Sequence, residues 1–203
     1  VKAALPGAFH PYRSKDVDPN QPINRLQFAE WIVQQDNPLM PRVVINRFWE
    51  SIFGLGLVRS SEDFGSQGDL PSHPELLDWL SAEIVRQEWN TKAILRLIVT
   101  SATYRQESVV SPERWEADQD NVYLSRGPRV RLNAEQIRDH ALAASGLLSH
   151  RMFGEPVRPR QPSSGLKAAF GSATDWETSQ GENSYRRGMY TVWRRSNPYP
   201  SMA

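Results

Sequence analysis

Four side chains that can ligate a metal occur within and just after a glycine-rich stretch: Asp63, Asp69, His73 and Asp78. Carboxylate oxygens are typical ligands of hard cations, and an imidazole beside them would suit zinc. The spacing matches no calcium-binding loop, and His73 followed by Pro74 also fits a helix start, where acidic residues are favourable. The pattern indicates a candidate divalent-metal site or, alternatively, an ordinary loop leading into a helix.

Arginines and aromatic residues alternate near the carboxyl end, in the segment YRRGMYTVWRR. Arginine holds anionic groups, and Tyr or Trp rings stack on sugars or bases. The alternative is an edge strand whose apolar side chains pack inward. The candidate residues for anion or glycan binding are Arg186, Arg187, Tyr190, Trp193, Arg194 and Arg195.

A third group of charged residues belongs to an expected helix: Glu135, Arg138 and Asp139. Glu135 and Arg138 can pair across one helical turn, which is usual on a solvated face. Beside the arginines of the carboxyl-terminal segment, the same residues would form an organised polar network.

Charge is unevenly distributed along the chain. Residues 122–203 contain 12 Lys and Arg against six acidic residues, whereas residues 1–121 contain 12 against 17. The basic residues are mostly arginine, which suits carboxylates, sulfates and phosphates. The acidic remainder and the lack of a known nucleic-acid-binding motif argue against a nucleic-acid partner.

Composition excludes several further classes of protein. The chain has no cysteine, so it can form neither a cysteine-ligated zinc site nor a covalent c-type haem attachment. No apolar run approaches the roughly 18 residues of a membrane-spanning helix, and no such span is expected in this chain. A divalent metal is the one cofactor that its own residues suggest.

Apolar residues recur at three- and four-residue spacing, which predicts a mainly α fold. The stretch 54–73 contains four glycines and is too long for an ordinary connector, so a functional or mobile loop is expected there. Residues 128–132 and 188–195 favour one small β ribbon. Helices are expected to begin near Asn24, Pro41, Ser72, Thr91, Ser111 and Asn133, with capping boxes at Asn24, Ser72 and Asn133.

Two regions are expected in the chain. Residues 1–23 contain four prolines and no regular period, which indicates a linker or extended arm. Residues 24–203 are expected to form a single irregular helical domain with long loops. Since the sequence begins at Val1, it is interpreted as a fragment of a larger multidomain protein.

Six ordered blocks of the sequence resemble one known family, the planctomycete-type cytochrome-c-associated domain of unknown function 1553, also called PSD1. The blocks are NRLQFAEWIV, NPLMPRVVINRFWESIFGLGLV, EDFGSQGDLPSHPELLDWL, LIVTSATYRQ, RLNAEQIRDHALAASGLL and YRRGMYTVWRRSNPYPSM. The resemblance implies a large exported parent, periplasmic or extracellular, with c-type haem in a separate module. It also implies a domain cut short at its carboxyl-terminal side, and it supplies no catalytic residue.

These observations predict an uncharacterised accessory or binding domain, associated with polysaccharide, anionic or neutral, or with neighbouring domains of the parent. One alternative is part of an enzyme: a metal-assisted hydrolase using Asp63 and His73, or the substrate domain of a haem-linked oxidoreductase. Another alternative is a purely structural packing domain. The residues alone leave these alternatives open.

Overall fold

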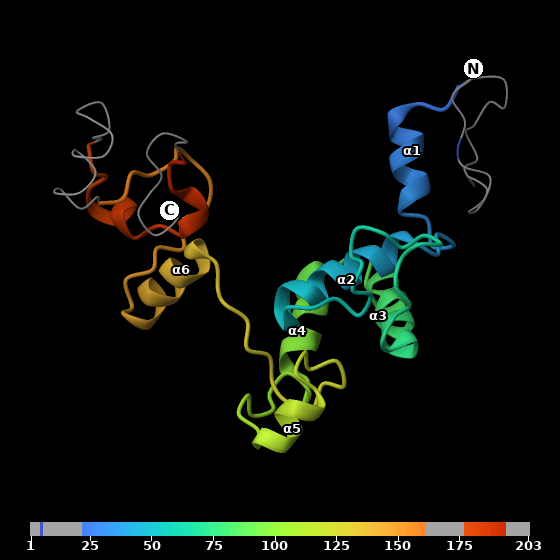
Figure 1. Cartoon of the computed structure of the whole chain (residues 1–203). Coiled ribbons are helices and arrows are strands. Elements are labelled where there is room, and N and C mark those ends of the chain that lie inside the picture. The colour runs from blue at the N-terminus through green and yellow to red at the C-terminus, as the bar shows by residue number, and fades with distance from the viewer. Residues whose placement is uncertain (1–4, 6–21, 161–176, 194–203) are drawn as a thin grey trace. The chain divides into compact units, whose positions relative to one another are not determined.

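The computed structural model describes residue 5, residues 22–160 and residues 177–193. In these residues the fold is helical with long connecting loops (Figure 1), which confirms the expected mainly α class. The expected linker, residues 1–23, lies almost entirely outside the described residues. The helices are α1 (Arg25–Ile32), α2 (Met40–Phe53), α3 (Pro74–Arg86), α4 (Thr91–Thr100), α5 (Pro112–Ala117) and α6 (Ala134–Ala144), followed by the short 3-10 helices η2 (Gly181–Tyr185) and η3 (Gly188–Tyr190).

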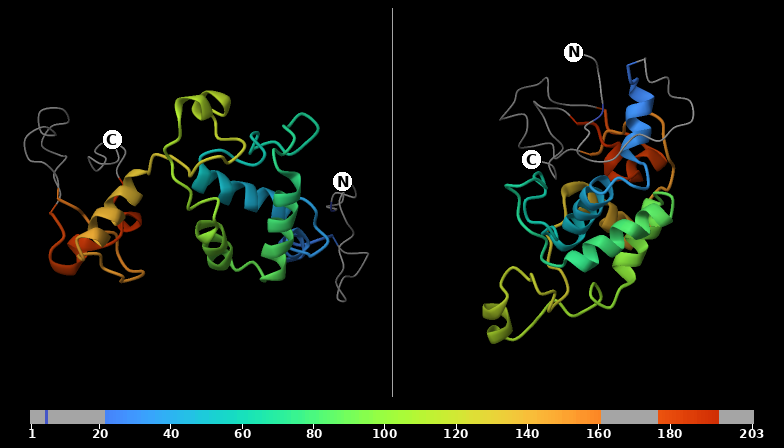
Figure 2. Two further views of the ribbon diagram at one scale, coloured as in Figure 1. Left: turned by 90° about the horizontal axis from the view of Figure 1, so that it is seen from below. Right: turned by 90° about the vertical axis from the view of Figure 1, so that its right-hand side faces the viewer.

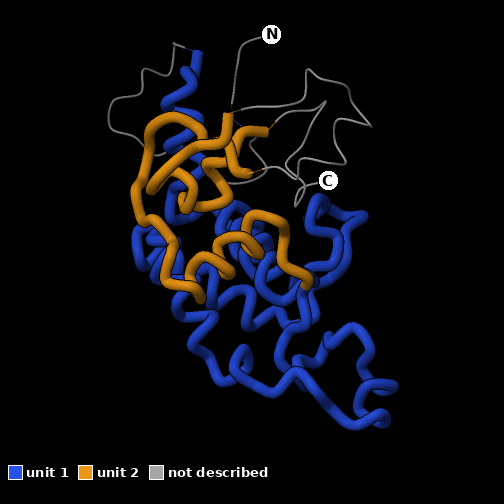
Figure 3. Tube along the Cα trace, turned by 90° about the vertical axis from the view of Figure 1, so that its left-hand side faces the viewer, with its two compact units in different colours: residues 1–130 blue, residues 131–203 orange. Residues whose placement is uncertain are grey.

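The chain divides into two compact units, residues 1–130 and residues 131–203 (Figure 3). We call them unit 1 and unit 2. Unit 1 contains α1 to α5, and unit 2 contains α6 and both 3-10 helices. Each unit is described by itself below.

The hydrophobic core of unit 1 lies among α2, α3 and α4. Helix α2 packs against α3, and α3 packs against α4 (Figure 2). The buried residues follow the three- and four-residue spacing of one helix face, so burial of this face stabilises the unit. Two residues of the loop after α2, Leu57 and Val58, join the same core. The helical core residues are Ile45, Trp49, Leu77, Leu80, Ile84, Ile94 and Ile98.

Capping residues set several helix ends as expected. Asn24 and Asn133 each form the predicted capping box, and Gly54 ends α2 with a left-handed φ of 89°. The capping box expected at Ser72 is wrong. The Ser72 hydroxyl donates instead to the carbonyl of Leu57 at 3.2 Å, and α3 begins at Pro74 without a side-chain cap.

The side chain of Asn37 connects the end of α1 to the start of α2. Its Nδ2 donates to the carbonyl of Ile32 at 2.9 Å, at the end of α1. Its Oδ1 accepts hydrogen bonds from the amides of Leu39 and Met40, where α2 starts. One side chain thus satisfies backbone groups at the ends of two successive helices.

Unit 2 is built from α6, η2, η3 and extended segments joined by two isolated bridges, Ser149 with Arg186 and Val157 with Thr191. The predicted β ribbon of 128–132 and 188–195 is wrong for the residues that are described. Residues 188–190 form η3, because the amides of Tyr190 and Thr191 donate to carbonyls three residues back, those of Arg187 and Gly188, and not to another strand. Gly188 packs closely on α6, and a Cβ there would lie 2.7 Å from Glu135 Cα. Helix α6 has no buried residue, and Ile137 is 51% exposed.

Candidate functional site

A cavity of about 380 Å³ lies in unit 1, between the end of α2 and two loops, residues 54–73 and residues 118–124. This volume falls within the range of small-ligand sites. Its lining combines apolar and charged groups, among them Trp49, Phe53, Arg59, Asp69, Leu70 and Asp120.

Aromatic side chains form the apolar side of the cavity. The rings of Trp49 and Phe53 are stacked, with centroids 4.1 Å apart and planes at 9°. Phe53 also meets the ring of Tyr104 edge-on at 5.9 Å. Leu70 has a side chain that is 90% exposed. An apolar ligand surface can therefore pack on the aromatic rings, with an exposed aliphatic side chain beside them.

An ion pair joins the two loops on the polar side of the cavity. Arg59 Nη2 lies 2.5 Å from Asp120 Oδ2, and the two side chains are 49% and 60% exposed. Exposed pairs of this kind contribute little to folding stability. Because the pair is accessible, its remaining donor and acceptor positions can hydrogen-bond a ligand.

The side chain of Asn46 fixes the loop that carries Arg59. This residue of α2 is fully buried, and its Oδ1 accepts from the amide of Val58 at 2.8 Å. Its Nδ2 donates to the Val58 carbonyl and to Ser61 Oγ, both at 3.0 Å. This close contact between Asn46 and the loop requires glycine at position 56, because a Cβ there would lie 2.5 Å from the Val58 carbonyl oxygen. One satisfied buried amide thus holds the Val58 backbone just before Arg59 and the Ser61 hydroxyl just after it.

Hydrogen bonds also order the rest of this loop. Ser60 Oγ donates to the carbonyl of Asp63 and accepts from the amide of Asp69, both at 2.8 Å. Asp63 Oδ1 accepts from the amide of Gly65 at 2.7 Å. The loop expected to be functional or mobile is therefore extensively hydrogen-bonded, and it presents Asp69 to the cavity.

The facing loop is held by Asp118 and Arg126, which are 8% and 4% exposed. The Asp118 carboxylate accepts from the amides of Val122 and Tyr123 at 2.7 and 3.0 Å. The Arg126 guanidinium donates to the carbonyls of Asp118 and Gln119, each at 2.7 Å. Asp120 is consequently presented from a backbone that other side chains hold in place.

The four candidate metal ligands make separate local contacts. Asp63 folds its own loop, and His73 Nδ1 lies 3.0 Å from Ser72 Oγ. Asp78 Oδ1 pairs with Arg42 Nε at 2.8 Å, whereas Asp69 lines the cavity. Within the described residues, no group of three His, Asp or Glu side chains is placed to hold a metal ion. A metal role for them stays a prediction.

Unit 2 uses two of the candidate glycan-binding arginines for its own contacts. Arg186 is 1% exposed, and its guanidinium donates to the carbonyls of Phe153 and Glu155 at 2.5 and 3.0 Å. Arg187 Nε pairs with Asp139 Oδ2 at 2.9 Å. Trp193 is 65% exposed and remains accessible. The Tyr190 ring lies against the Arg186 guanidinium, and the last two candidates, Arg194 and Arg195, lie outside the described residues.

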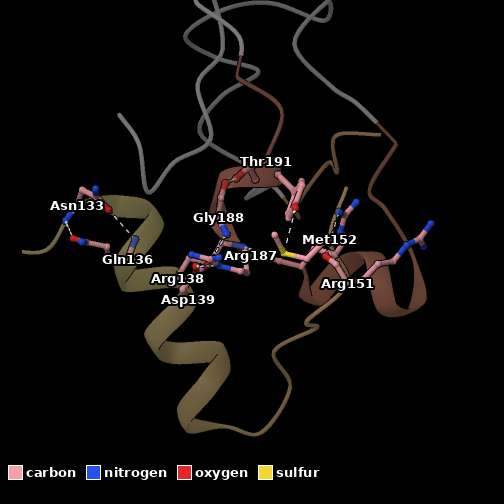
Figure 4. A network of polar contacts seen from close by, with 11 residues as sticks. Asn133, Gln136, Arg138, Asp139, Arg151, Met152, Arg187, Gly188 and Thr191 are labelled. Atoms are coloured by element: carbon pink, nitrogen blue, oxygen red, sulfur yellow. Dashed lines mark hydrogen bonds and ion pairs between the residues drawn. The ribbon is translucent and has the colours of Figure 1, made fainter. Parts of the chain in front are cut away.

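Helix α6 and the segment leading to η3 are joined by a polar network (Figure 4). Arg138 Nη2 donates to the carbonyl of Ser184 at 2.7 Å, and Asp139 Oδ1 accepts from the amide of Gly188 at 2.6 Å. Gly188 also packs against the backbone of Glu135. These contacts hold α6 to the segment around η3 and so organise unit 2.

Other hollows in unit 1 combine fewer kinds of chemistry. A groove of about 670 Å³ beside α3 includes the Arg42–Asp78 pair. A cup of about 230 Å³ beside α1 is lined almost entirely by apolar side chains such as Trp31 and Met40. The cavity between the two loops is the stronger candidate because it brings aromatic rings and charged groups together in one lining, on hydrogen-bonded loops.

Sequence reasoning missed Asn46, Arg59 and Asp120. Asn46 had a local signal, since it is a polar residue adjoining the apolar stripe of α2. Arg59 and Asp120 are 61 positions apart, and no local pattern connects them.

These features define a helical domain that carries a ligand-sized cavity on two hydrogen-bonded loops. The chain belongs to the PSD1 family of proteins of unknown function (DUF1553), whose family model matches residues 24–203. No curated protein and no solved structure matches the chain. Among the described residues, no helix has the length and apolar character needed to cross a bilayer.

Proposed function

We propose that this chain is a non-catalytic binding domain of a larger protein, and that it binds polysaccharide in the cavity between loops 54–73 and 118–124. One observation carries the proposal: the same cavity is lined by the stacked rings of Trp49 and Phe53 and by the Arg59–Asp120 pair. A sugar presents hydroxyl groups on its edges and C–H groups on its faces, and this cavity offers partners for both.

The expected binding geometry follows from the chemistry of the lining. The Asp69 and Asp120 carboxylates accept hydrogen bonds from sugar hydroxyls, and Arg59 donates to hydroxyl or ring oxygens. The C–H face of the sugar packs toward Phe53, with Leu70 folding over it, which removes apolar surface from water. Fixed loops reduce the conformational entropy lost on binding.

The resemblance to cytochrome-associated domains supports two further parts of the proposal. The parent is exported, to the periplasm or outside the cell, where polysaccharide is available. Any c-type haem belongs to a separate module, because this chain has no cysteine to attach one. The accessory domain would then hold the parent on its substrate.

Calorimetric titration of the full chain with neutral oligosaccharides tests the proposal. Hexamers of β-1,4-glucose, β-1,4-xylose and β-1,4-N-acetylglucosamine serve as probes. We expect at least one to bind, and Asp120→Ala to weaken its binding about tenfold or more, which corresponds to about 1.4 kcal/mol. Glu116→Gln, on exposed α5, is the matched surface control.

Mass spectrometry of the same mixtures separates binding from catalysis. Intact hexamers after prolonged incubation agree with a binding domain, whereas shortened products would establish an enzyme. If no hexamer binds, the chain has the structural packing role instead.

A further inference from the structure

The charges around the cavity point to the class of polysaccharide it accepts, an inference that rests on the proposed function. We infer that the cavity selects chains bearing free amino groups, accepts neutral chains more weakly, and rejects sulfated or carboxylated chains. This assignment differs from the basic surface that the carboxyl-terminal sequence suggested.

Acidic residues outnumber basic ones around the cavity. Arg59 is the one cation among its lining residues, against Asp69 and Asp120. Arg59 also lines an adjoining hollow of about 710 Å³, together with Arg47. The adjoining hollow adds three carboxylates, those of Glu50, Glu62 and Asp63. Two arginines thus stand against five carboxylates, and the local field is negative.

The pairing of Arg59 strengthens this imbalance. Its guanidinium is engaged by Asp120 at 2.5 Å, so an anionic ligand must compete with a carboxylate already in place. Asp69 contributes its backbone amide to Ser60 Oγ, and the structure shows no hydrogen bond or ion pair to its carboxylate from the residues it describes. An uncompensated negative charge therefore borders the cavity.

A sugar carrying an ammonium group is complementary to both the negative local field and the Asp69 carboxylate. Its ammonium can pair with Asp69, while its hydroxyls bond to the Arg59–Asp120 pair and its C–H face packs toward Phe53. A charge-assisted hydrogen bond of this kind is stronger than a neutral one. Sulfate or carboxylate at the same place would meet Asp69 at short range and be repelled.

Three hexasaccharides compared by calorimetry on the full chain test the inference. These are β-1,4-glucosamine, its N-acetylated form and a heparin hexasaccharide, at about pH 5.5. The first two share a backbone and differ in charge. We expect the amino form to bind at least tenfold more tightly than the acetylated form, and heparin not to bind. Raising salt to about 1 M should reduce that preference, since screening weakens the ion pair.

Asp69→Asn identifies the group responsible. We expect this variant to bind the amino and acetylated forms with equal affinity, because the charge that pairs with the ammonium is gone, whereas Glu116→Gln keeps the wild-type preference. Equal affinities of the wild-type chain for the first two sugars, tighter binding of heparin, or an unchanged preference in Asp69→Asn would overturn the inference. In those cases measured saccharide binding would leave the proposed function standing. Absence of binding by every sugar, including the neutral glucose and xylose hexamers, would overturn both.

Discussion

The guanidinium carbon of Arg186 lies 3.8 Å from the centroid of the Tyr190 ring, inside unit 2. The Tyr190 hydroxyl in turn accepts a hydrogen bond from the amide of Phe153 at 2.9 Å. The same Arg186 donates to the carbonyls of Phe153 and Glu155. The buried Arg186 thus binds carbonyl groups of one loop, and Tyr190 binds an amide of the same loop.

Arg186→Met should loosen this loop. Replacing the guanidinium leaves the carbonyls of Phe153 and Glu155 without these charged donors, and we expect unit 2 to lose about 1.5–3 kcal/mol of stability. Exchange of the Phe153 amide, which is bonded to the Tyr190 hydroxyl, should accelerate accordingly. Arg158→Met, at an exposed side chain, is the control and should leave this rate unchanged. Unchanged protection in Arg186→Met would contradict the role we give this residue.

Asn46→Ala should disturb the loop that carries Arg59. The backbone groups of Val58 would lose their partners, and we expect about 1–3 kcal/mol of destabilisation. Urea unfolding measures this loss, and any sugar affinity should fall with it. Ser51→Ala, on the same helix but exposed, should change stability by less than about 0.5 kcal/mol. A stable Asn46→Ala chain with normal affinity would show that the loop orders without this amide.

Ile84→Ala tests the core among α2, α3 and α4. Ile84 is fully buried, so truncation leaves a cavity and should cost about 2–5 kcal/mol. Val99→Ala, on α4 with 37% exposure, should cost clearly less. Equal losses in the two variants would contradict the placement of the core.

The ionised carboxylate of Glu83 should contribute to folding stability, and this contribution should disappear in acid. Hydrogen bonds from Arg86 and Gln87 lower the pKa of Glu83 from 4.5 to about 2. The folded chain therefore binds fewer protons than the unfolded chain between these values. The stabilisation is complete above pH 4.5 and is lost as pH falls toward 2.

Urea midpoints measured from pH 7 to pH 2 check this prediction with Glu83→Gln. The variant should be less stable than the wild type at pH 7, and the difference should shrink below pH 4.5. Glu116→Gln should instead run parallel to the wild type. A difference for Glu83→Gln that is independent of pH would mean that the carboxylate charge contributes nothing.

Divalent ions test the metal alternative directly. Since Asp63, His73 and Asp78 make separate contacts, we expect zinc, magnesium and calcium to shift the melting temperature equally in the wild type, Asp63→Asn and His73→Ala. A zinc shift seen in the wild type and lost in both variants would establish a site that these residues share.

The sequence predicted features that short-range contacts decide. The capping boxes of Asn24 and Asn133 depend on residues three positions apart, and both formed. Ser72 had the same pattern, but the Leu57 carbonyl, 15 positions away, takes its hydroxyl. Arg186 was predicted to bind an anion or glycan, because no local pattern shows which distant carbonyls a guanidinium will reach.

The cavity also combines features that short-range patterns predict with features that depend on long-range contacts. Glycine content marked loop 54–73 as unusual, because that signal is local. The ion pair between Arg59 and Asp120 depends on how two loops fold against one core. No sequence pattern around either residue predicts this pair. Prediction therefore reached the helices and the loop, but not the Arg59–Asp120 pair that joins the two loops at the cavity.

The hydrogen bonds that hold the loops have a consequence for engineering. Asn46, Ser60 and Asp118 shape the backbone, whereas Asp69, Leu70 and Asp120 direct their side chains toward the cavity. Because the two sets are different residues, the lining can be resurfaced while the framework is kept. Libraries that vary only the lining would turn this domain into a scaffold for new specificities.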